Sequence, residues 1–245
     1  MNSRLFALSV LFYYSLTLAG QNYEIKVKVK NYTRDTLLLG YHYGDKQYIK
    51  DTAIGKNGEF VFKRDTVLEP GMYLLVTQPE HDFCQFLVDY DKQKFTIETD
   101  KTDLAKNLKF KNSRLNQDFM NYVSFVSARR VIADSLTRQL KDSKDTILRR
   151  SLDDRLKGLD KEVKVFQDKV ISEQGKSILG LMIRSTKEVE LPEFEGNEEE
   201  KNEKLYRFYK AHYFDYTDFK DDRVLRMPFF QPRIDKYLSN LVSQH

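Results

Sequence analysis

The sequence predicts an α+β protein in which strands and helices are segregated: an N-terminal antiparallel β-sandwich is followed by an α-helical domain with a long helical hairpin. Residues 23–30 alternate between apolar and charged side chains, which is the period of a half-buried strand. Short β-rich runs follow at close intervals as far as residue 111. From Ser113 onward, apolar residues recur three or four positions apart, which is the period of a helix.

The first 20 residues, MNSRLFALSVLFYYSLTLAG, are typical of a secretory signal peptide. A single positive charge at Arg4 precedes an apolar run over residues 5–18, and the small residues Thr17 and Ala19 lie near its end. The run is shorter than the roughly 20 residues that a membrane span needs, although its two tyrosines leave an uncleaved N-terminal anchor open as an alternative. We therefore expect a protein of the periplasm or cell envelope. No later apolar stretch approaches membrane length, so the mature chain should contact a membrane at most peripherally.

The composition is that of a folded chain with nearly balanced charge. Of 245 residues, 13% are aromatic, and 41 Lys and Arg residues against 37 Asp and Glu residues give a net charge of +4. Disordered chains have fewer aromatic residues and a larger net charge. Nucleic-acid binders need basic residues clustered on one face, so the balance argues against nucleic acid as a partner.

The chain has a single cysteine, Cys84. One cysteine cannot form an internal disulfide, a CxxC redox pair or a zinc site of several thiolates. Its place in a β-rich run favours a buried, unreactive thiol over one that forms a mixed disulfide with a redox partner. No catalytic or phosphate-binding motif is present, so we expect a non-enzymatic protein without a cofactor or a metal.

Seven or eight short strands are expected in a β-sandwich domain over residues 21–111. The expected strands cover residues 23–30, 36–43, 48–54, 59–63, 72–78, 83–89, 94–99 and 108–111. Turn residues separate them and no helical period interrupts them, which indicates a sandwich or barrel of antiparallel strands, the sandwich being preferred. The lysines at alternate positions of the first strand are interpreted as protection of an edge strand against pairing, rather than as a basic patch for phosphate or lipid.

Residues 112–245 are expected to form the α-helical domain. Ser113 is the expected N-cap of a first helix that continues to Leu140, and the polar residues 141–145 interrupt the pattern. Seven apolar residues from Leu148 to Val170 are then spaced close to a heptad repeat. Such a seam could pair two chains in a coiled coil, but two helices joined by about five polar residues more simply form an antiparallel hairpin.

Shorter elements complete the expected helical domain. A short apolar helix covers residues 177–183, and the acidic segment 187–202, which lacks any period, is interpreted as a solvated loop. A cation site at its consecutive glutamates is disfavoured because neighbouring side chains point in different directions. Two final helices, 203–214 and 232–242, flank an aromatic and charged loop over residues 215–230.

The densest group of polar and aromatic side chains lies near the C-terminus and is the candidate binding cluster. Its members are Tyr209, His212, Tyr213, Asp218, Asp221, Asp222, Arg223 and Arg226. Carboxylates and an imidazole at such spacing suit metal binding or acid–base chemistry. However, the chain has no HxxxH motif or regular oxygen-ligand loop, and Asp beside Arg favours ion pairing and helix capping, which is the preferred interpretation.

Short motifs along the chain resemble those of known envelope proteins. They are DTA at 51–53, GEFVF at 58–62, PGMY at 70–73, NSRLNQDF at 112–119, YR at 206–207, HYF at 212–214, DF at 218–219, DDRVLR at 221–226, Pro228 and YL at 237–238. Through these motifs the first half resembles the N-terminal domain of unknown function that precedes TlpA-like thioredoxin domains in envelope proteins of Gram-negative bacteria. The second half is similar to the helical domain that often follows it.

The resemblance implies an accessory role without catalysis. In those proteins a thioredoxin-like domain carrying CxxC normally comes next, and this sequence ends at His245 before any such domain. The two modules would hold, dimerise or orient a thioredoxin-like domain, so the expected partner is such a domain, another envelope protein or a second copy of the chain.

Two alternatives stay open. The chain could be a fragment or subunit of a thiol-disulfide oxidoreductase whose CxxC domain lies outside it. It could also be a ligand-binding or glycan-binding envelope protein that uses the aromatic loop between Tyr209 and Phe230 at a cleft between the two domains.

Overall fold

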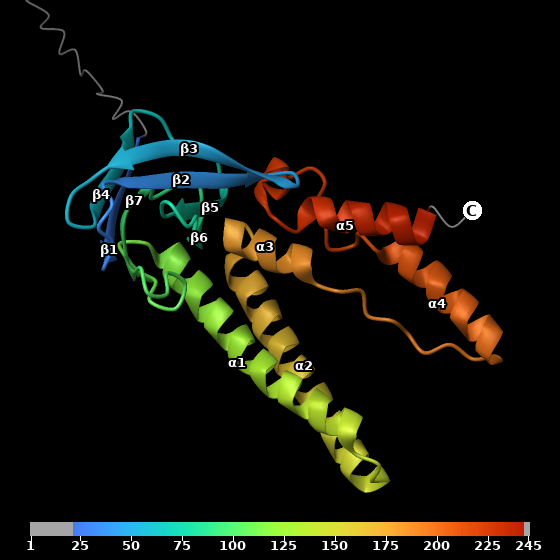
Figure 1. The fold of residues 1–245 in the computed structure, drawn as a ribbon. Coiled ribbons are helices and arrows are strands. Elements are labelled where there is room, and N and C mark those ends of the chain that lie inside the picture. The colour runs from blue at the N-terminus through green and yellow to red at the C-terminus, as the bar shows by residue number, and fades with distance from the viewer. Residues whose placement is uncertain (1–21, 243–245) are drawn as a thin grey trace, which may run out of the picture.

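The computed structural model describes residues 22–242, in which two four-stranded sheets precede a set of helices (Figure 1). The strands are β1 (Tyr23–Lys30), β2 (Thr36–Tyr43), β3 (Lys46–Ile54), β4 (Glu59–Arg64), β5 (Gly71–Val76), β6 (Phe83–Val88), β7 (Lys94–Asp100) and β8 (Lys109–Lys111). The helices are α1 (Arg114–Asp142), α2 (Thr146–Gln174), α3 (Ile178–Thr186), α4 (Glu198–His212), the 3-10 helix η1 (Asp222–Arg226), α5 (Phe230–Tyr237) and the π-helical turn η2 (Leu238–Val242). The predicted α+β class is confirmed, and the strands of residues 22–242 form no closed barrel. The predicted signal peptide at residues 1–20 lies outside the described residues.

The two sheets pack face to face and enclose a first hydrophobic core. Their strand orders are β4-β1-β7-β8 and β3-β2-β5-β6. On β1 the residues Tyr23, Ile25, Val27 and Val29 are at most 2% exposed, whereas the lysines between them face solvent. Because a shift of one residue would exchange the two faces, this alternation fixes the register of the strand.

The interpretation of the first strand as an edge strand is wrong. β1 lies between β4 and β7, where Val27 is paired with Phe60 on one side and with Ile97 on the other. Its outward charges form ion pairs: Lys28 Nζ lies 2.8 Å from Glu59 Oε1 of β4, and Lys26 pairs with Glu24 of β1 itself. Lysines of this row therefore take part in ion pairs on the outer face of a central strand.

The sandwich is also not wholly antiparallel. β1 and β7 run parallel, with Ile25 opposite Phe95, whereas the other strand pairs are antiparallel. Parallel neighbours need a crossover connection. Between β1 and β7 the chain forms β2 and β3 in the other sheet, returns to β4 beside β1, and then forms β5 and β6 in the other sheet.

The predicted antiparallel helical hairpin is present as α1 and α2, which project away from the sandwich (Figure 1). Side-chain caps begin both helices. Ser113 Oγ accepts a hydrogen bond from the backbone N–H of Asn116, and the Asp145 carboxylate accepts from those of Ile147 and Leu148. Each cap pairs a backbone group that the first turn of a helix leaves free.

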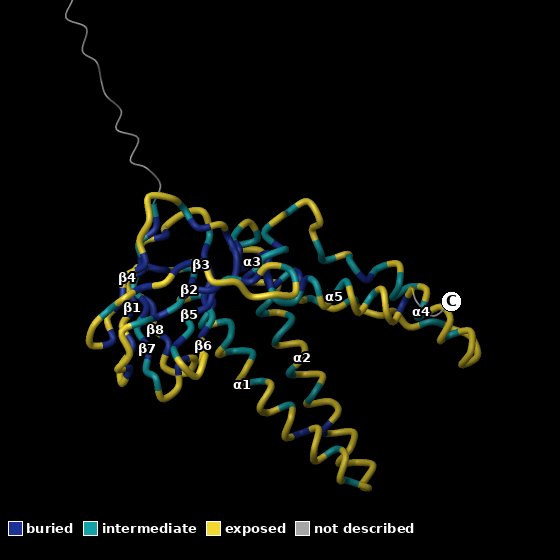
Figure 2. Tube along the Cα trace, turned by 45° about the horizontal axis from the view of Figure 1, so that its top comes forward, coloured by how far each residue is buried: buried dark blue, intermediate teal, exposed yellow. Residues whose placement is uncertain are grey.

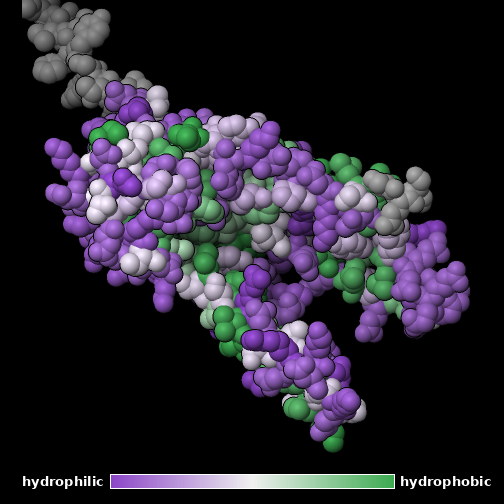
Figure 3. All heavy atoms as spheres, in the orientation of Figure 1, coloured by the Kyte–Doolittle hydropathy of each residue, from purple (hydrophilic) through white to green (hydrophobic). Residues whose placement is uncertain are grey.

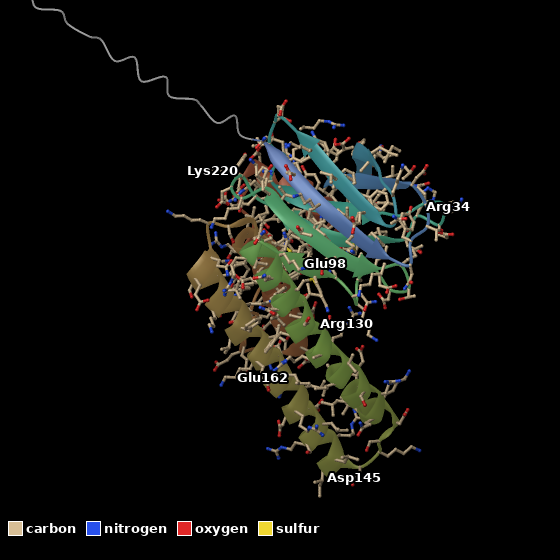
Figure 4. All side chains as sticks on the ribbon, turned by 90° about the vertical axis from the view of Figure 1, so that its left-hand side faces the viewer. Arg34, Glu98, Arg130, Asp145, Glu162 and Lys220 are labelled. Atoms are coloured by element: carbon tan, nitrogen blue, oxygen red, sulfur yellow. The ribbon has the colours of Figure 1, made fainter. Side chains whose placement is uncertain are left out.

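The hairpin is held together by aromatic contacts between its helices. Phe166 of α2 stacks on Phe125 of α1 with ring centroids 4.2 Å apart, and the Arg129 guanidinium lies 3.4 Å from the centroid of the same Phe125 ring. Toward the tip, where Asp145 marks the free end, most side chains are exposed (Figures 2 and 4). The heptad seam is therefore used within the chain and only in part, since Leu152 is buried but Leu148 is 46% exposed.

Two segments predicted as loops contain helices. α4 begins at Glu198 and not at residue 203, because Asn197 caps it and Glu200 completes a capping box. The glutamates of its first turn lie where the helix dipole favours negative charge. η1 lies within the predicted loop 215–230, where Asp221 caps it. The last predicted helix begins at Phe230, before residue 232, and continues from α5 into η2.

A second core joins the sandwich to the helices. It lies on the outer face of the β3-β2-β5-β6 sheet, where Met72 and Leu87 meet apolar side chains of α1, α2, α3, η1 and α5. The other members of this core come from the helices and from the turn after η1, and they are Phe119, Val170, Ile178, Leu179, Leu181, Met182, Ile183, Val224, Met227 and Phe230. The division predicted between residues 111 and 112 thus separates two segments that share buried side chains. Among residues 22–242, no helix combines the length and the apolar character that a membrane crossing requires.

Candidate functional site

The candidate binding cluster does not converge on one site, because successive residues of a helix or turn point in different directions. At the end of α4, His212 Nδ1 lies 2.7 Å from Asp215 Oδ2, and the imidazole stacks on Phe208 with ring centroids 4.2 Å apart. Asp218 instead closes a local turn, since its Oδ1 accepts from the backbone N–H of Lys220. Within residues 22–242, no group of three or more His, Cys, Asp or Glu residues is arranged to hold a metal ion.

Asp221 and Arg223 join the C-terminal segment to the sandwich and to the root of the hairpin. Arg223 donates to Asp221 through Nε at 2.8 Å and through Nη2 at 2.6 Å, and these hydrogen bonds hold the pKa of the Asp221 carboxyl below its usual range. Nη1 of Arg223 donates to the carbonyl of Lys176 and lies 3.6 Å from Asp89, which follows β6. Asp89 in turn accepts from the backbone N–H of Ile178 at the start of α3. Asp221 and Arg223 therefore form a junction between η1, the end of β6 and the turn that joins α2 to α3.

Arg226 and its neighbours pack η1 against the sandwich. A Cβ atom at Gly71 would lie 2.6 Å from Arg226 Cβ, so the glycine leaves the space that η1 occupies. The backbone N–H of Gly44, in the turn between β2 and β3, donates to the carbonyl of Leu225 at 2.8 Å. The Arg226 guanidinium reaches Asp222 only at 3.8 Å. Apart from the polar contacts of Arg223, η1 is therefore held against the sandwich by the Gly44 hydrogen bond and by packing.

The two tyrosines of the cluster line a pocket of about 300 Å³ between α3, α4 and the start of α5. The rings of Tyr209 and Tyr213 meet edge to face with centroids 5.4 Å apart. Tyr213 is buried, which raises the pKa of its hydroxyl, and this hydroxyl donates to the carbonyl of Arg233 at 3.2 Å. Apolar side chains also gather at the surface where α4 and α5 meet (Figure 3). Of the places that the cluster occupies, this one has the shape of a ligand site.

Two polar residues of this pocket, Ser185 and Arg233, were missed by reasoning from the sequence. Ser185 lies on the same helical face as Ile178 and Met182, and a serine on a buried helix face is a signal that could have been used. Arg233 gives no such signal. Its hydrogen-bond acceptors are backbone carbonyls of residues far away in the sequence, at Ser185 and Tyr213.

Cys84 lies in the core of the sandwich, as the sequence predicted. It is 2% exposed, and burial raises the pKa of its thiol to about 12. At neutral pH the group is therefore a protonated thiol, whereas the nucleophile of thiol chemistry is the thiolate.

Comparison with curated proteins gives no match, and comparison with solved structures gives none either. A family model does match the first part of the chain. Residues 23–119, which comprise both sheets and the first residues of α1, match the model described as Domain of unknown function (DUF4369). The expectation of an N-terminal domain of unknown function is thereby confirmed. The match does not address the expected link to TlpA-like thioredoxin domains.

Proposed function

We propose that this protein is a non-catalytic binding or positioning module of the cell envelope, of the kind that precedes TlpA-like thioredoxin domains. The buried Cys84 is the observation that carries the proposal. Thiol–disulfide exchange requires a thiolate that can reach the sulfur of a disulfide. A thiol with a pKa of about 12 and 2% exposure meets neither requirement at neutral pH.

The attachment of the helices supports a positioning role. The second core and the Arg223 contacts hold the hairpin root, α3 and η1 against one sheet of the sandwich. From this base the hairpin and the α4–α5 arm diverge (Figure 1). The sandwich, the α1–α2 hairpin and the segment formed by α4 and α5 therefore expose separate surfaces in a defined arrangement. A module that orients a second domain requires such an arrangement.

Exposed apolar side chains on the hairpin support a protein partner. Val131 of α1 is 69% exposed, and Ile147 and Val165 of α2 are 83% and 61% exposed. Apolar side chains left in water on a projecting element favour burial against another protein. The partner that we propose is a thioredoxin-like domain, with another envelope protein or a second copy of the chain as the alternatives.

An insulin-reduction assay with dithiothreitol tests the non-catalytic role. We expect no turnover by the chain alone, the same result for Cys84→Ser, and a changed rate when the chain is added to a separate TlpA-like domain that carries CxxC. A thiol reagent should label Cys84 in denaturant and not in the native protein. Insulin turnover by the wild-type chain that Cys84→Ser abolishes would overturn the proposal and favour an oxidoreductase.

Cell fractionation tests the envelope location separately. Expressed in a Gram-negative host, the full chain should be recovered from the periplasm, and a chain starting at Gln21 should remain in the cytoplasm. Equal distribution of the two forms would contradict export through residues 1–20.

Binding of a small ligand is the second candidate function. The specific observation in its favour is the pocket between α3, α4 and α5, whose polar atoms are not all paired by the protein.

A further inference from the structure

Two residues that line the pocket between α3, α4 and α5 carry buried polar atoms without partners among the described residues. Ser185 is 2% exposed, and its Oγ makes no hydrogen bond. Nε of Arg233 is likewise buried and unpaired. Both residues line the pocket. An unpaired buried polar group is costly, so two of them at one pocket point to a ligand that pairs them.

Arg233 also brings a positive charge, and within residues 22–242 its hydrogen-bond acceptors are all neutral backbone carbonyls. Its Nη1 donates to the carbonyl of Ser185 at 2.7 Å and to that of Lys187 at 3.3 Å. Its Nη2 donates to the carbonyl of Tyr213 at 2.7 Å and to that of Lys187 at 3.4 Å. A guanidinium has five N–H donors in a fixed planar arrangement, so these bonds hold the group in place and leave the Nε–H as the donor still to be paired. The charge and the free donor together favour an anionic oxygen.

The remaining lining indicates what the anion is attached to and how large its charge is. Tyr209, Tyr213 and Phe229 supply aromatic surface, which suits an apolar body. Lys236 follows Arg233 by about one turn on α5 and adds a second cation. Glu188 lines the same pocket, and its carboxylate disfavours an ion with two negative charges.

We propose that this pocket binds the carboxylate of a small organic acid. Both atoms are closed off from solvent, so binding requires the lining side chains to shift and expose them. One carboxylate oxygen then accepts from the Arg233 Nε–H and the other from the Ser185 hydroxyl, while an aromatic or aliphatic body lies against Tyr209 and Phe229. The volume of about 300 Å³ is at the lower end for ligand pockets, so the acid is a small molecule and not a glycan chain. The proposal rests on the ligand-binding role and is independent of the positioning role.

Titration of the chain starting at Gln21 with sodium benzoate and sodium hexanoate, followed through backbone amide NMR signals, tests the site. We expect saturable shifts confined to α3, α4, α5 and the residues next to them. Benzyl alcohol and inorganic phosphate should bind more weakly than benzoate by about tenfold, because the first lacks the charge and the second carries more of it. The absence of saturable shifts with both carboxylates overturns the proposal. Equal binding of benzyl alcohol overturns recognition of the carboxylate, and equal binding of phosphate overturns selection for an organic acid.

Ser185→Ala tests the hydroxyl with little risk to folding, because the Ser185 Oγ has no partner in the protein. We expect benzoate affinity to fall by about tenfold and the melting temperature without benzoate to stay the same or rise. Ser172→Ala, which changes an exposed serine of α2, is the matched control and should bind benzoate like the wild type. A folded Ser185→Ala protein with wild-type affinity overturns the assignment.

Lys236→Gln tests the second cation. Benzoate affinity should fall several-fold and become less sensitive to salt, whereas Lys161→Gln on the hairpin should leave both unchanged. An unaltered salt dependence in Lys236→Gln overturns the role of this charge. None of these variants should change the result of the insulin-reduction assay, so failure of carboxylate binding and failure of the non-catalytic role are distinguishable.

Discussion

At the scale of single residues, one buried amide explains the motif at residues 112–119. Asn116 is fully buried; its Oδ1 accepts from the backbone N–H of Leu87 at 2.7 Å, and its Nδ2 donates to the Leu87 carbonyl at 2.8 Å. Leu87 lies on β6, the last strand of its sheet, so its outward backbone groups have no neighbouring strand. Ser113 begins α1, and Asn116 completes the sheet edge, so the motif couples the sandwich to the first helix.

Asn116→Ala should destabilise the protein by about 2–4 kcal/mol, because it leaves a buried donor and a buried acceptor of Leu87 unpaired. Urea denaturation of the two proteins measures the difference in the free energy of unfolding. Asn121→Ala changes an exposed asparagine of the same helix and should have little effect. Equal stability of Asn116→Ala and Asn121→Ala would show that the amide is not needed at the sheet edge.

A buried histidine should make stability depend on pH. His42 is 6% exposed and its Nε2 lies 3.0 Å from Gln85 Nε2; burial lowers the pKa of the imidazole below its usual value of 6.5. The unfolded chain therefore binds a proton at a higher pH than the folded protein does. Stability contributed by neutral His42 is complete above pH 6.5, falls as the pH drops below 6.5, and stops falling once the pH is below the folded pKa.

The measurement is the urea midpoint between about pH 7 and pH 5. His42→Gln should reduce its pH dependence, because glutamine does not titrate. His81→Asn is the control: His81 is exposed, and asparagine tolerates its left-handed φ of 59°. The prediction is wrong if His42→Gln keeps the pH dependence of the wild type.

At the scale of elements, local patterns were predictable and long-range pairing was not. The helical hairpin follows from spacing and from the caps Ser113 and Asp145, all of which are readable in sequence. The Asn197 capping box was readable as well, but the acidic composition around it suggested a loop. The position of β1 inside its sheet depends on β7, which is distant in the sequence, so alternation along β1 alone could not reveal it.

Two glycine substitutions test how η1 is docked. Gly71→Ala should destabilise the protein by about 1–3 kcal/mol, since the new Cβ would lie 2.6 Å from Arg226 Cβ and η1 would have to move. Gly158→Ala in α2 meets nothing within 4 Å and should stabilise the protein by about 0.5–1 kcal/mol through helix propensity. Urea denaturation gives both values. Stabilisation by Gly71→Ala would contradict the close approach of η1 to β5.

At the scale of the whole molecule, the fold disperses the residues of the candidate binding cluster and brings together pocket and core residues that are distant in the sequence. The cluster between Tyr209 and Arg226 is compact in sequence but is divided among the end of α4, the junction and the pocket. The pocket itself takes Ser185 from α3 and Arg233 from α5, and the second core takes Met72 and Leu87 from the sandwich. A candidate site chosen from residues close in the sequence therefore includes both tyrosines of the pocket, Tyr209 and Tyr213. It misses Ser185 and Arg233, whose polar atoms give the pocket its chemistry.

The shared second core predicts that the sandwich and the helices unfold in one transition. Small proteins with a continuous core unfold cooperatively, whereas independent domains show separate midpoints. In urea, the amide NMR signals of β1 and of α3 should be lost at the same midpoint, and Gly71→Ala should lower both midpoints equally because η1 contacts both parts of the fold. Amides near Asp145 serve as an internal control, since the exposed hairpin tip can open locally at lower urea concentrations. Separate midpoints for β1 and α3 would show that the boundary predicted at residues 111 and 112 divides two independently stable domains, and that the second core does not couple them.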